Sequence, residues 1–548
     1  MNETVDGVPD VCFVSMPYVE IQRPSLALSL LQSILARDGI SSRVVHASMW
    51  FAEKVGANTY ATAMTTPPTF LAGEWSFAAA AFPGRPDQDE EYLRLFAEGL
   101  ADPFVGVTDT DRRVELLREL RTAADEFVGE AARRVLDTGA RVVGCTSTFE
   151  QHTPSLALLR RIHELDPDVI TMMGGANCET VMGEATHRLF PWVDYVVSGE
   201  ADGIISDLCR RVLKQGRDIE TADLPPGVLG PRHRRQLAIL GGKRVPRALF
   251  GDLDSLPAPS YADYFETLEQ SPLRDRIVPG LPLETSRGCW WGAKHQCTFC
   301  GLNGSSLGYR SKSAERVLEE VETLWDRHGI SGFEVVDNIL DMRYFQTLLP
   351  RLAEDRKPWR FFYEVKANLS HDQLELLVRS GVKWVQPGIE SLHSEVLRLM
   401  DKGVAGWQNI QLLKWCKELG MRLSWSLLWG FPGEKDDYYL EMARWIPLLE
   451  HLQAPFGLNP LAYHRYSVYH AQAEELGLTL FPVAAMSYVY PVRESDLNDL
   501  AYFFTLAADR ARLDPMGRNP DGSLNPGVQA TLAAIEHWIS AAHSRRPP

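Results

Sequence analysis

Three of the eight cysteines lie in one short stretch, SRGCWWGAKHQCTFCGLNG, between residues 286 and 304. Cys289, Cys297 and Cys300 have the spacing C-x7-C-x2-C, and no fourth cysteine follows nearby. Three thiolates could hold a [4Fe–4S] cluster at three irons and leave the fourth iron open to a substrate or cofactor. The glycines before and after the cysteines would let the backbone wrap such a cluster.

Zinc is the alternative that the same loop allows. His295 lies between the cysteines, and three cysteines with one histidine are a known zinc set. However, His295 precedes Cys297 by only two residues, which is not the paired spacing of zinc knuckles, and no second knuckle is present. Analysis of bound iron and sulfide would distinguish an iron–sulfur cluster from a zinc ion.

The bulk composition narrows the class of protein. The 548 residues are enough for about three domains. A net charge of −16 argues against nucleic acid as the main partner, because phosphate binding needs a clustered basic surface. No apolar run is long enough to span a membrane, and the N-terminus lacks the layout of a signal peptide. We therefore expect a cytoplasmic protein, whose clustered thiols serve metal binding or catalysis.

Strands and helices alternate in the first part of the chain. Apolar runs at residues 10–17, 41–47, 140–149, 168–175 and 194–201 predict strands, and residues 25–39, 154–165 and 203–214 predict helices between them. This order predicts parallel strands in an α/β, doubly wound sheet, with ligands at the carboxyl ends of the strands. Residues 51–139 interrupt the rhythm and include an acidic helical run from residue 109.

A second β/α series follows a Pro- and Gly-rich linker. Its predicted strands are residues 281–288, 332–338, 360–368, 383–391 and 422–434, each followed by a helical pattern. Such a series predicts a barrel or partial barrel, whose chemistry lies at the carboxyl ends of the strands. The cysteines directly follow the first strand of this series. The last 75 or so residues have a mainly helical pattern.

The chain resembles the radical S-adenosylmethionine (SAM) superfamily, and specifically its members with an N-terminal cobalamin-binding domain. The segments VVDNIL, EVKANL, GIESLHSEVLRLMDKG and WGFPGE carry this resemblance in the second series, and PSLALSLLQSILARDGI, GGAN and VSGEAD carry it in the first. The C-x7-C-x2-C spacing departs from the commoner C-x3-C-x2-C. With HRYSVYH and NDLAYFF, it is similar to the subgroup that matures ribosomally made peptides, including C-methyltransferases.

The resemblance implies the following domains. Residues 1–225 would be a Rossmann-like cobalamin-binding domain with a helical insertion at about 51–139, and 226–280 a linker. Residues 281–470 would form a radical SAM (β/α)6 partial TIM barrel, and 471–548 a mainly helical C-terminal region.

The resemblance also implies site residues for the cluster and SAM. Cys289, Cys297 and Cys300 would ligate the [4Fe–4S] cluster, and the open iron would bind SAM. Glu390 and Ser391 match the position that contacts the SAM ribose. Six further residues at strand ends or beyond the cysteine loop are candidates for contact with SAM. Their alternative role is ion pairing or packing within the protein. They are Tyr309, Arg310, Asp337, Asn338, Glu364 and Lys366.

For cobalamin, three strand-end loops are implied. Residues Gly174, Gly175, Ala176, Ser198, Gly199 and Glu200 would line the nucleotide tail, and Ser147 and Thr148 could hydrogen-bond it. The D-x-H-x-x-G motif that supplies a histidine to cobalt in many cobalamin proteins is absent. Gln151 and His152 are the nearest approach to it, and neutral imidazole can bind a transition metal. We expect the loop to pack beneath the corrin without histidine ligation.

The function implied is radical C-methylation of an unactivated sp3 carbon in a precursor peptide, using a 5′-deoxyadenosyl radical and methylcobalamin. Tyr463, His464 and Arg465 could face that substrate, and a flavodoxin- or ferredoxin-type protein would supply electrons. The same cofactors could instead perform cyclopropane formation or another carbon rearrangement, or act on a small natural product. The alternative that is not an enzyme is a zinc-stabilised cobalamin-binding module without turnover.

Overall fold

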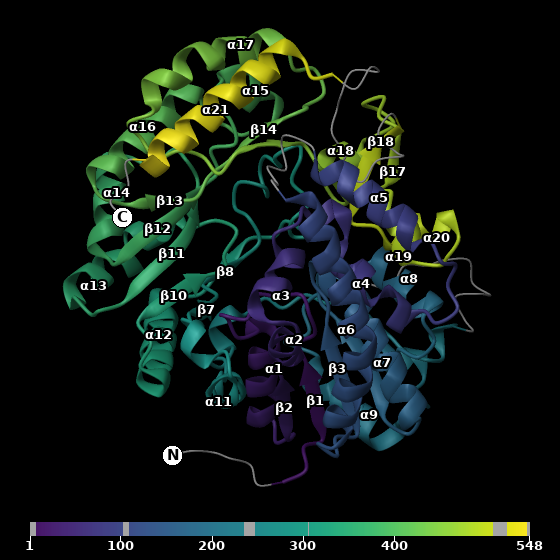
Figure 1. The fold of residues 1–548 in the computed structure, drawn as a ribbon. Helices are drawn as coiled ribbons and strands as arrows, with labels where there is room; N and C mark the ends of the chain where they lie inside the picture. Colours follow the sequence, from purple (N-terminus) through teal and green to yellow (C-terminus); the bar gives the residue numbers. More distant parts are fainter. Residues whose placement is uncertain (1–6, 102–108, 235–246, 305, 508–522, 545–548) are drawn as a thin grey trace. The chain divides into compact units, whose positions relative to one another are not determined.

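The protein is described by a computed structural model that covers residues 7–101, 109–234, 247–304, 306–507 and 523–544 (Figure 1). Its contacts divide the chain into two compact units. The first comprises Met1–Pro279 with Pro482–Tyr502, and the second comprises Gly280–Phe481 with Phe503–Pro548. Among the described helices, none combines the length and apolar character needed to cross a bilayer.

The sheet of the first unit confirms the predicted doubly wound fold. Its strands have the order β2-β1-β3-β4-β5-β6, and all neighbours are parallel except β5 and β6. Apolar residues of β1 are buried throughout, as expected for a strand covered on both faces. The strand bounds are β1 (Val11–Val14), β2 (Ser42–Val45), β3 (Val142–Thr146), β4 (Ile170–Gly174), β5 (Tyr195–Val197) and β6 (Val228–Leu229).

Helices cover this sheet at the predicted positions. Helix α1 (Leu26–Arg37) begins at Ser25, whose hydroxyl accepts a hydrogen bond from the Leu28 N–H at 3.4 Å, and it packs beside α9 (Ile205–Gln215). Helix α7 (His152–Leu165) contacts α4 and α6 instead. Helix α8 (Val181–Leu189), which lies between β4 and β5, was not predicted.

The insertion is helical, as expected, and contributes to the core of the first unit. Its helices are α2 (Ala47–Val55), α3 (Ala57–Met64), α4 (Ala72–Ala81), α5 (Asp89–Leu100) and α6 (Thr110–Leu136). Helix α4 is buried on nearly all sides, since α6, α7 and α19 all contact it (Figure 1). A helix that is apolar all round is one that neighbours enclose.

Residues 226–280, predicted as a linker, pack on the first unit in their described part. They include β6, and Leu253 and Leu256 belong to the hydrophobic core of that unit. On α11 (Ala262–Gln270), the carboxylate of Asp263 accepts hydrogen bonds at 2.7 Å from the Val44 N–H and from the Gln32 amide. Proline and glycine therefore set turns here, while the apolar residues between them are buried.

The second unit has the predicted partial barrel. Strands β7 (Leu281–Leu283), β10 (Gly332–Val335), β11 (Arg360–Val365), β12 (Val382–Pro387) and β13 (Arg422–Leu423) form one parallel sheet. Strands β14 (Leu427–Trp429) and β15 (Leu458–Pro460) form a parallel pair, joined to the rest by a bridge between Glu390 and Leu427. Residues 422–434, predicted as one strand, are thus divided between β13 and β14.

Helices alternate with these strands. They are α12 (Ala314–His328), α13 (Leu348–Asp355), α14 (His371–Arg379), α15 (Ser394–Leu399), α16 (Gly406–Glu418) and α17 (Asp436–Trp445). The C-terminal helix α21 (Pro526–Ser544) lies along α17 (Figure 1). Its first turn is fixed by Asp436, whose carboxylate accepts a hydrogen bond from the Gly527 N–H at 2.8 Å.

The C-terminal region is helical but also contains strands. Strands β16 (Tyr463–His464), β18 (Phe503–Leu506) and β17 (Leu480–Pro482) form a small sheet, and α18 (Val468–Ala471) follows β16. Helices α19 (Ala485–Val489) and α20 (Glu494–Leu500) belong to the first unit. We call Pro482–Tyr502 the return segment, because there the chain goes back to the first unit.

Polar contacts, one of them fully buried, hold the return segment. The Tyr490 hydroxyl donates to the Glu74 carboxylate on α4 at 2.6 Å. Arg188 on α8 pairs with Asp496, and also with Asp499 at 2.9 Å. The return segment thereby joins α4 and α8.

We predict that Tyr490→Phe lowers the free energy of unfolding by about 1–3 kcal/mol, because it removes a donor from a buried carboxylate. Chemical denaturation measures the change. Tyr488→Phe is the matched control in the same segment, since its side chain is only half-buried; it should cost less than about 0.5 kcal/mol. Equal effects of the two substitutions would contradict the role given to the Tyr490–Glu74 hydrogen bond.

Candidate active site

The cysteine loop leaves the barrel at the carboxyl end of β7. Two short antiparallel strands, β8 (Ser286–Arg287) and β9 (Arg310–Ser311), close its base. Gly288 has a φ of 84°, and a Cβ there would lie 2.3 Å from the Gly308 carbonyl oxygen. The loop can therefore close only with glycine at this position.

All three cysteines of the loop are free and half-buried. The Gly292 N–H donates to the Cys289 sulfur at 3.3 Å. Burial raises the pKa of Cys297, and raises that of Cys300 to about 11, although Lys402 acts in the opposite direction on both. Without a metal these two thiols hold their protons at neutral pH, so binding a metal must release protons.

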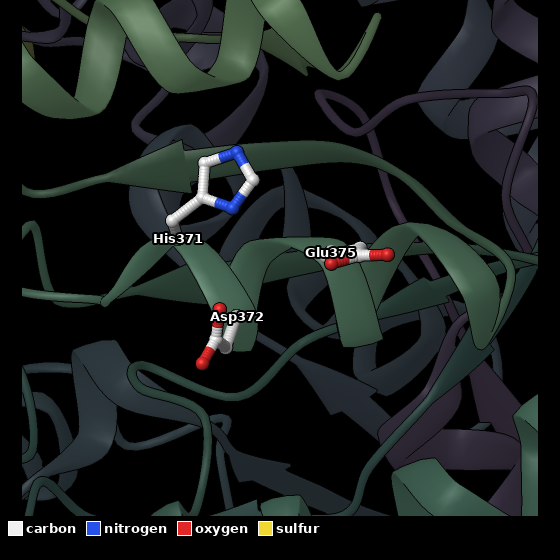
Figure 2. A group of neighbouring side chains, drawn as sticks. All are labelled: His371, Asp372 and Glu375. Carbon is white, nitrogen blue, oxygen red and sulfur yellow. The ribbon is translucent and has the colours of Figure 1, made fainter.

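A different group of side chains has the compact geometry of a single-ion site. In the described part of the chain, one set of three metal-ligating residues has its ligand atoms within 4.8 Å of one another: His371, Asp372 and Glu375 on α14. Figure 2 shows them on the first turns of that helix, where both carboxylates are exposed. Exposed acidic groups of this kind are common surface features, and the three cysteines do not form such a set.

The residues between Cys289 and Cys297 anchor the loop to the barrel. The Trp290 indole N–H donates to the Leu340 carbonyl at 3.0 Å, and the Trp291 indole N–H donates to the Asp401 carbonyl at 3.2 Å. The Trp291 ring also stacks on His295, with 4.9 Å between centroids, and the Lys366 ammonium lies 3.6 Å from its centroid. The long spacing thus provides two indole anchors.

The second half of the loop is held from α15 and from the segment after β16. Thr298 donates through its N–H to the Met400 carbonyl at 3.0 Å and through its hydroxyl to the Leu399 carbonyl at 3.1 Å. The Gln296 amide donates to the carbonyls of Cys300 and Tyr466, each at 3.0 Å. Hydrogen bonds within the protein therefore hold the loop at both ends.

A charged cluster lies beside the cysteines at the strand ends. Lys402 pairs with Glu390 at 3.1 Å, and the Lys366 ammonium donates to the Lys402 carbonyl. Burial lowers the pKa of Lys366 to about 8. Burial, with the neighbouring Glu390 carboxylate, raises the pKa of Glu364 to about 7. The structure therefore brings the predicted residues Glu364, Lys366 and Glu390 together.

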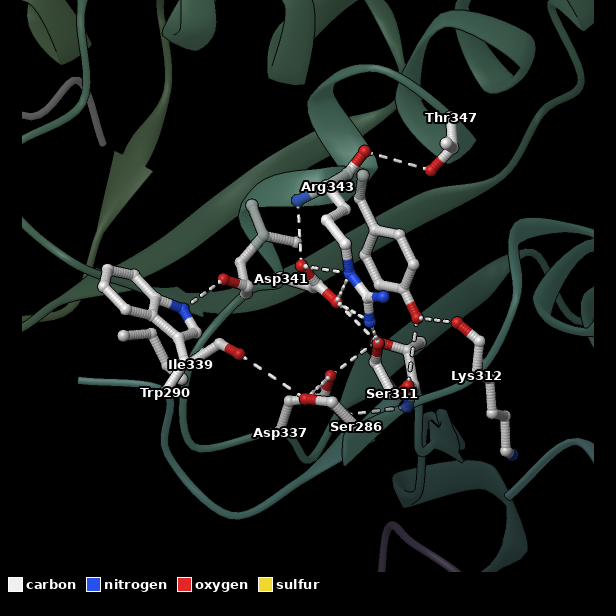
Figure 3. Close-up of polar contacts among 12 residues, drawn as sticks. Ser286, Trp290, Ser311, Lys312, Asp337, Ile339, Asp341, Arg343 and Thr347 are labelled. Atoms are coloured by element: carbon white, nitrogen blue, oxygen red, sulfur yellow. Dashed lines mark hydrogen bonds and ion pairs between the residues drawn. The ribbon is translucent and has the colours of Figure 1, made fainter. Parts of the chain in front are cut away.

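Asp337 is turned inward rather than toward the mouth (Figure 3). Its carboxylate accepts hydrogen bonds from the Thr285 N–H and the Ser286 hydroxyl, each at 2.7 Å. Burial raises its pKa to about 6 despite these donors. Asp337 thus fixes the strand end from which the cysteine loop departs, and a contact with SAM remains a prediction.

The neighbours of Asp337 extend this network. The Asn338 amide donates to the Asn303 side chain at 2.6 Å, which ties the strand end to the cysteine loop. The Asp341 carboxylate accepts from the Ser311 hydroxyl on β9 at 2.5 Å and pairs with Arg343 at 2.8 Å (Figure 3). Asp341 and Arg343 were missed from the sequence, where a D-x-R spacing gives no specific signal.

The other residues of the second unit that were predicted to contact SAM are Ser391, Tyr309 and Arg310. Ser391 is fully buried and its hydroxyl accepts from the His393 N–H at 3.1 Å, which turns it away from the mouth. Burial raises the pKa of Tyr309, and Arg310 donates to the Gly308 carbonyl at 3.1 Å. Both belong to the closing strand pair or adjoin it.

Tyr463 and His464 form β16 of the small sheet, and Arg465 directly follows it. Tyr463 and His464 pair with Phe504 and Phe503 of β18, and the Arg465 guanidinium lies 5.0 Å from the Phe504 centroid. Burial lowers the pKa of His464 to about 4. These contacts are those of a packed sheet, and a substrate role for the three residues remains a prediction.

In the first unit, the strand order locates the expected ligand edge. The chain turns from β1 to β2 on one side and to β3 on the other, so the switch point lies between the carboxyl ends of β1 and β3. The loop after β3 holds four of the predicted residues. Ser147 is buried, and the Gln151 amide donates to the Met16 carbonyl at 2.7 Å while its oxygen accepts from the Thr148 N–H.

His152 is a core residue with a protein partner at each ring nitrogen. Its Nδ1 lies 3.1 Å from the Ser147 hydroxyl and its Nε2 lies 3.2 Å from the Thr186 hydroxyl. The ring packs against Phe190 and Tyr490, and burial lowers its pKa to about 3. The imidazole is therefore neutral and bonded within the protein, and the absence of histidine ligation to cobalt remains a prediction.

The glycine loop after β4 has both structural and open positions. Gly175 has a φ of 100°, and a Cβ there would lie 2.6 Å from the Ser147 carbonyl oxygen, so only glycine fits. Gly175 and Ala176 are nevertheless exposed, whereas Gly174 is half-buried. Asn177, which the sequence did not single out, donates from its amide to the Ser147 hydroxyl at 2.9 Å and bridges the two loops.

The turn after β5 is covered by the protein itself. A Cβ on Gly199 would lie 2.2 Å from the Ala248 carbonyl, which accepts a hydrogen bond from the Glu200 N–H at 2.9 Å. The Glu200 carboxylate accepts from the Phe250 N–H at 2.9 Å, and the Ser198 hydroxyl accepts from the Thr180 N–H at 2.8 Å. The turn is thus bonded within the protein, and a cobalamin role for Ser198, Gly199 and Glu200 remains a prediction.

Two buried carboxylates connect the insertion to the loop after β3. Glu74 on α4 accepts from the His152 and Thr153 N–H groups at 2.8 and 2.9 Å, and so caps α7. Glu150, just before α7, accepts in return from the Gly73 N–H at 2.8 Å in the first turn of α4. Each helix thus receives a carboxylate from the other at its positive end.

We predict that Glu150→Gln flattens the pH dependence of stability. Burial, aided by the Glu74 carboxylate, raises the pKa of Glu150 well above its usual range. The folded state then binds this proton more tightly than the unfolded state, so stability falls as pH rises from about 4 through the raised pKa. Between pH 6 and pH 9 the Tm of Glu150→Gln should fall less than that of wild type.

The exposed Glu126→Gln on α6 is the matched control for that experiment, since its side chain is 70% exposed. It should keep the wild-type slope of Tm against pH. A Glu150→Gln variant with the wild-type slope would show that this carboxyl group has the same pKa folded and unfolded.

We also predict that Trp291→Leu weakens metal retention by the cysteine loop. The substitution removes the hydrogen bond to Asp401 and the contact with Lys366, and residues that support metal ligands typically contribute about tenfold to metal affinity. Iron loss from reconstituted protein under chelator challenge should be about tenfold faster. Lys294→Ala, an exposed change in the same loop, is the control and should match wild type. Equal rates of iron loss from the two variants would show that the Trp291 indole does not help to retain the metal.

Comparison with known proteins agrees with this geometry. Residues 283–446 match the sequence model described as the Radical SAM superfamily. The chain is similar to the uncharacterized methyltransferase PH0819 of Pyrococcus horikoshii, with 26% identity over 319 residues, 57% of this chain and 65% of that protein. The chain thus spans about 65% of the length of this curated relative.

Two solved structures share the fold over most of the chain. OxsB, a cobalamin-dependent SAM radical enzyme solved with aqua-cobalamin and SAM, has a TM-score of 0.59 at 14% identity, over 97% of this chain and 67% of that one. TsrM of Kitasatospora setae, a radical SAM methyltransferase solved with cobalamin and a [4Fe–4S] cluster, has a TM-score of 0.53 at 16% identity, over 85% and 78%. The resemblance predicted from the sequence is confirmed as a similarity: residues 283–446 match the Radical SAM superfamily model, and the chain shares its fold with the solved structures of OxsB and TsrM.

Proposed function

We propose that this protein is a cobalamin-dependent radical SAM methyltransferase that methylates an unactivated sp3 carbon of a ribosomally made precursor peptide. The observation that carries the proposal is the three-cysteine loop, which a network of protein hydrogen bonds holds at the carboxyl end of β7. Partial barrels place reactive groups at this end of their strands. The strand order of the first unit supplies a second ligand edge.

The residues present fit an iron–sulfur cluster. Cys289, Cys297 and Cys300 would hold three irons, and the protons on the buried thiols would leave when the cluster binds. Lys366 and Lys402 are close enough to Cys297 to favour its thiolate form. The negative charge of a cluster held by three thiolates would thus be partly balanced by these two ammonium groups.

The charged cluster beside the loop fits the polar groups of SAM. Glu390 is held by Lys402, and Glu364 lies near enough to Glu390 to feel its charge. A carboxylate so placed can accept hydrogen bonds from ribose hydroxyls, and an ammonium group can pair with a carboxylate. The Trp291 ring lies against Lys366 and would limit access of water on that side.

When bound, the cluster with SAM supplies a 5′-deoxyadenosyl radical, and methylcobalamin supplies the methyl group. Gly175 and Ala176 at the sheet edge are exposed, so a large ligand could lie against the backbone there. The chain itself would bind and orient these groups. An external flavodoxin- or ferredoxin-type protein in the cytoplasm would supply the electrons.

A peptide substrate is supported by the C-x7-C-x2-C spacing and by the HRYSVYH and NDLAYFF segments. The net charge of −16 would suit a basic peptide. Cyclopropane formation or another carbon rearrangement, a small natural-product substrate, and a zinc-stabilised cobalamin module without turnover are the other outcomes that the experiment must separate.

We predict that anaerobically reconstituted protein contains iron and sulfide and cleaves SAM to 5′-deoxyadenosine. Replacement of Cys289, Cys297 or Cys300 by Ser should reduce this cleavage to background. Cys416→Ser, at a buried cysteine on α16, is the control and should keep cleavage. With the cognate precursor peptide, mass spectrometry should show the gain of one methylene group.

Each other result has a defined meaning. Bound zinc without iron would favour the last alternative, a zinc-stabilised cobalamin-binding module without turnover. SAM cleavage with an unchanged peptide mass would exclude peptide methylation, and loss of hydrogen from the peptide would indicate a different radical outcome.

A further inference from the structure

The seven residues 290–296, which we call the insert, contain the longest exposed run in the described part of the cysteine loop, residues 293–295. The His295 N–H donates to the Trp291 carbonyl at 2.7 Å, as in one turn of a helix. Two of the expected cluster ligands bound the insert on either side. Its exposed side chains are therefore among the solvent-facing groups that lie nearest to those ligands in the chain.

An aromatic stack leads from this exposed surface into the site. The His295 side chain is 55% exposed, and its ring stacks on the Trp291 ring with 4.9 Å between centroids and 28° between planes. The Trp291 ring also contacts the Lys366 ammonium, which lies 3.6 Å from its centroid and interacts electrostatically with Cys289 and Cys297. Electron tunnelling slows steeply with distance, and conjugated rings in contact shorten the gap. The stack thus offers an electron a route from solvent toward the cysteines.

The cysteine loop is basic although the protein is acidic. Residues 285–314 include four lysines and arginines and no aspartate or glutamate, in a chain with a net charge of −16. Lys294 carries the positive charge of the exposed run. Asp401, 54% exposed, is an acidic neighbour whose carboxylate lies 3.9 Å from the His295 ring and opposes that charge. A negatively charged partner would be attracted to the insert by Lys294 and repelled by Asp401.

We propose that the insert is the docking surface for a small acidic one-electron carrier of the flavodoxin class, with Lys294 attracting the carrier and the His295–Trp291 stack conducting the electron. The inference rests on the proposed function for the presence of the cluster. One electron passes from the reduced flavin of the carrier to the oxidised cluster, and no covalent bond forms or breaks in this step. Electron-transfer complexes bury small interfaces, below about 1,200 Å², so a few exposed residues suffice.

The rate of cluster reduction after rapid mixing of reconstituted protein with reduced flavodoxin tests the docking surface. Lys294→Glu should lower the second-order rate constant about tenfold at low ionic strength, because charges near a docking site steer association. Asp401→Asn should raise it about threefold for the same reason, and asparagine suits the φ of 51° at this position. Both effects should shrink as salt is added.

Substitutions of His295 test the stack. His295→Ala removes its exposed end and should lower the limiting rate at saturating flavodoxin severalfold, whereas His295→Phe keeps a stacking ring and should preserve that rate. Lys414→Glu, an exposed charge reversal on α16, is the matched control and should keep wild-type kinetics. Photoreduced deazaflavin, a small uncharged reductant, should reduce the cluster of every variant at the wild-type rate, since it needs no docking surface.

Wild-type rates with flavodoxin in both Lys294→Glu and His295→Ala would overturn the proposal. Equal slowing with flavodoxin and with deazaflavin would overturn it as well, since the change would then lie in the cluster and not in docking. Failure of the proposed function is distinct from both, because wild-type protein would then hold no iron–sulfur cluster for either reductant to reduce.

Discussion

The buried carboxylate of Asp337 is the contact on which the proposed active site depends. It joins the ends of β7 and β10 by accepting hydrogen bonds from Thr285 and Ser286, directly before the cysteine loop. A buried carboxylate is costly unless donors surround it, and here the donors come from the segment that must be fixed. The glycine turn at Gly288, the indole anchors and the Asn338–Asn303 contact all build outward from this point.

The loop and the charged cluster support each other. Lys366 contacts Trp291 on one side and the Lys402 carbonyl on the other, and Lys402 pairs with Glu390. One chain of contacts therefore runs from the insert between the cysteines to the carboxylates at the strand ends. Groups fixed in this way before ligands bind need little reorganisation, which is how a protein directs the chemistry of its cofactors.

The sequence predicted the elements better than the orientation of side chains. Hydrophobic periodicity identified both β/α series, because burial of strands and helix faces is a local pattern. A ligand role for Asp337, Ser391 and the Ser198–Glu200 turn remains a prediction. In the structure the Asp337 and Ser391 side chains are bonded within the protein, since a polar residue at a strand end can serve either a ligand or the protein. The Ser198–Glu200 turn is likewise bonded to residues 248–250. Contacts of that kind join distant segments and leave no periodic signal.

The return segment also determines when the first unit can be completed during synthesis. Residues 280–481, the larger part of the second unit, separate Pro279 from Pro482, so Tyr490 and Asp496 leave the ribosome long after their partners Glu74 and Arg188. At about 5–20 residues per second, translation of the intervening segment takes roughly 10–40 s. Throughout this interval the Glu74 carboxylate lacks its tyrosine donor and α8 lacks its acidic partners. The barrel is thus synthesised while the first unit is still incomplete, and the two units mature together rather than one after the other.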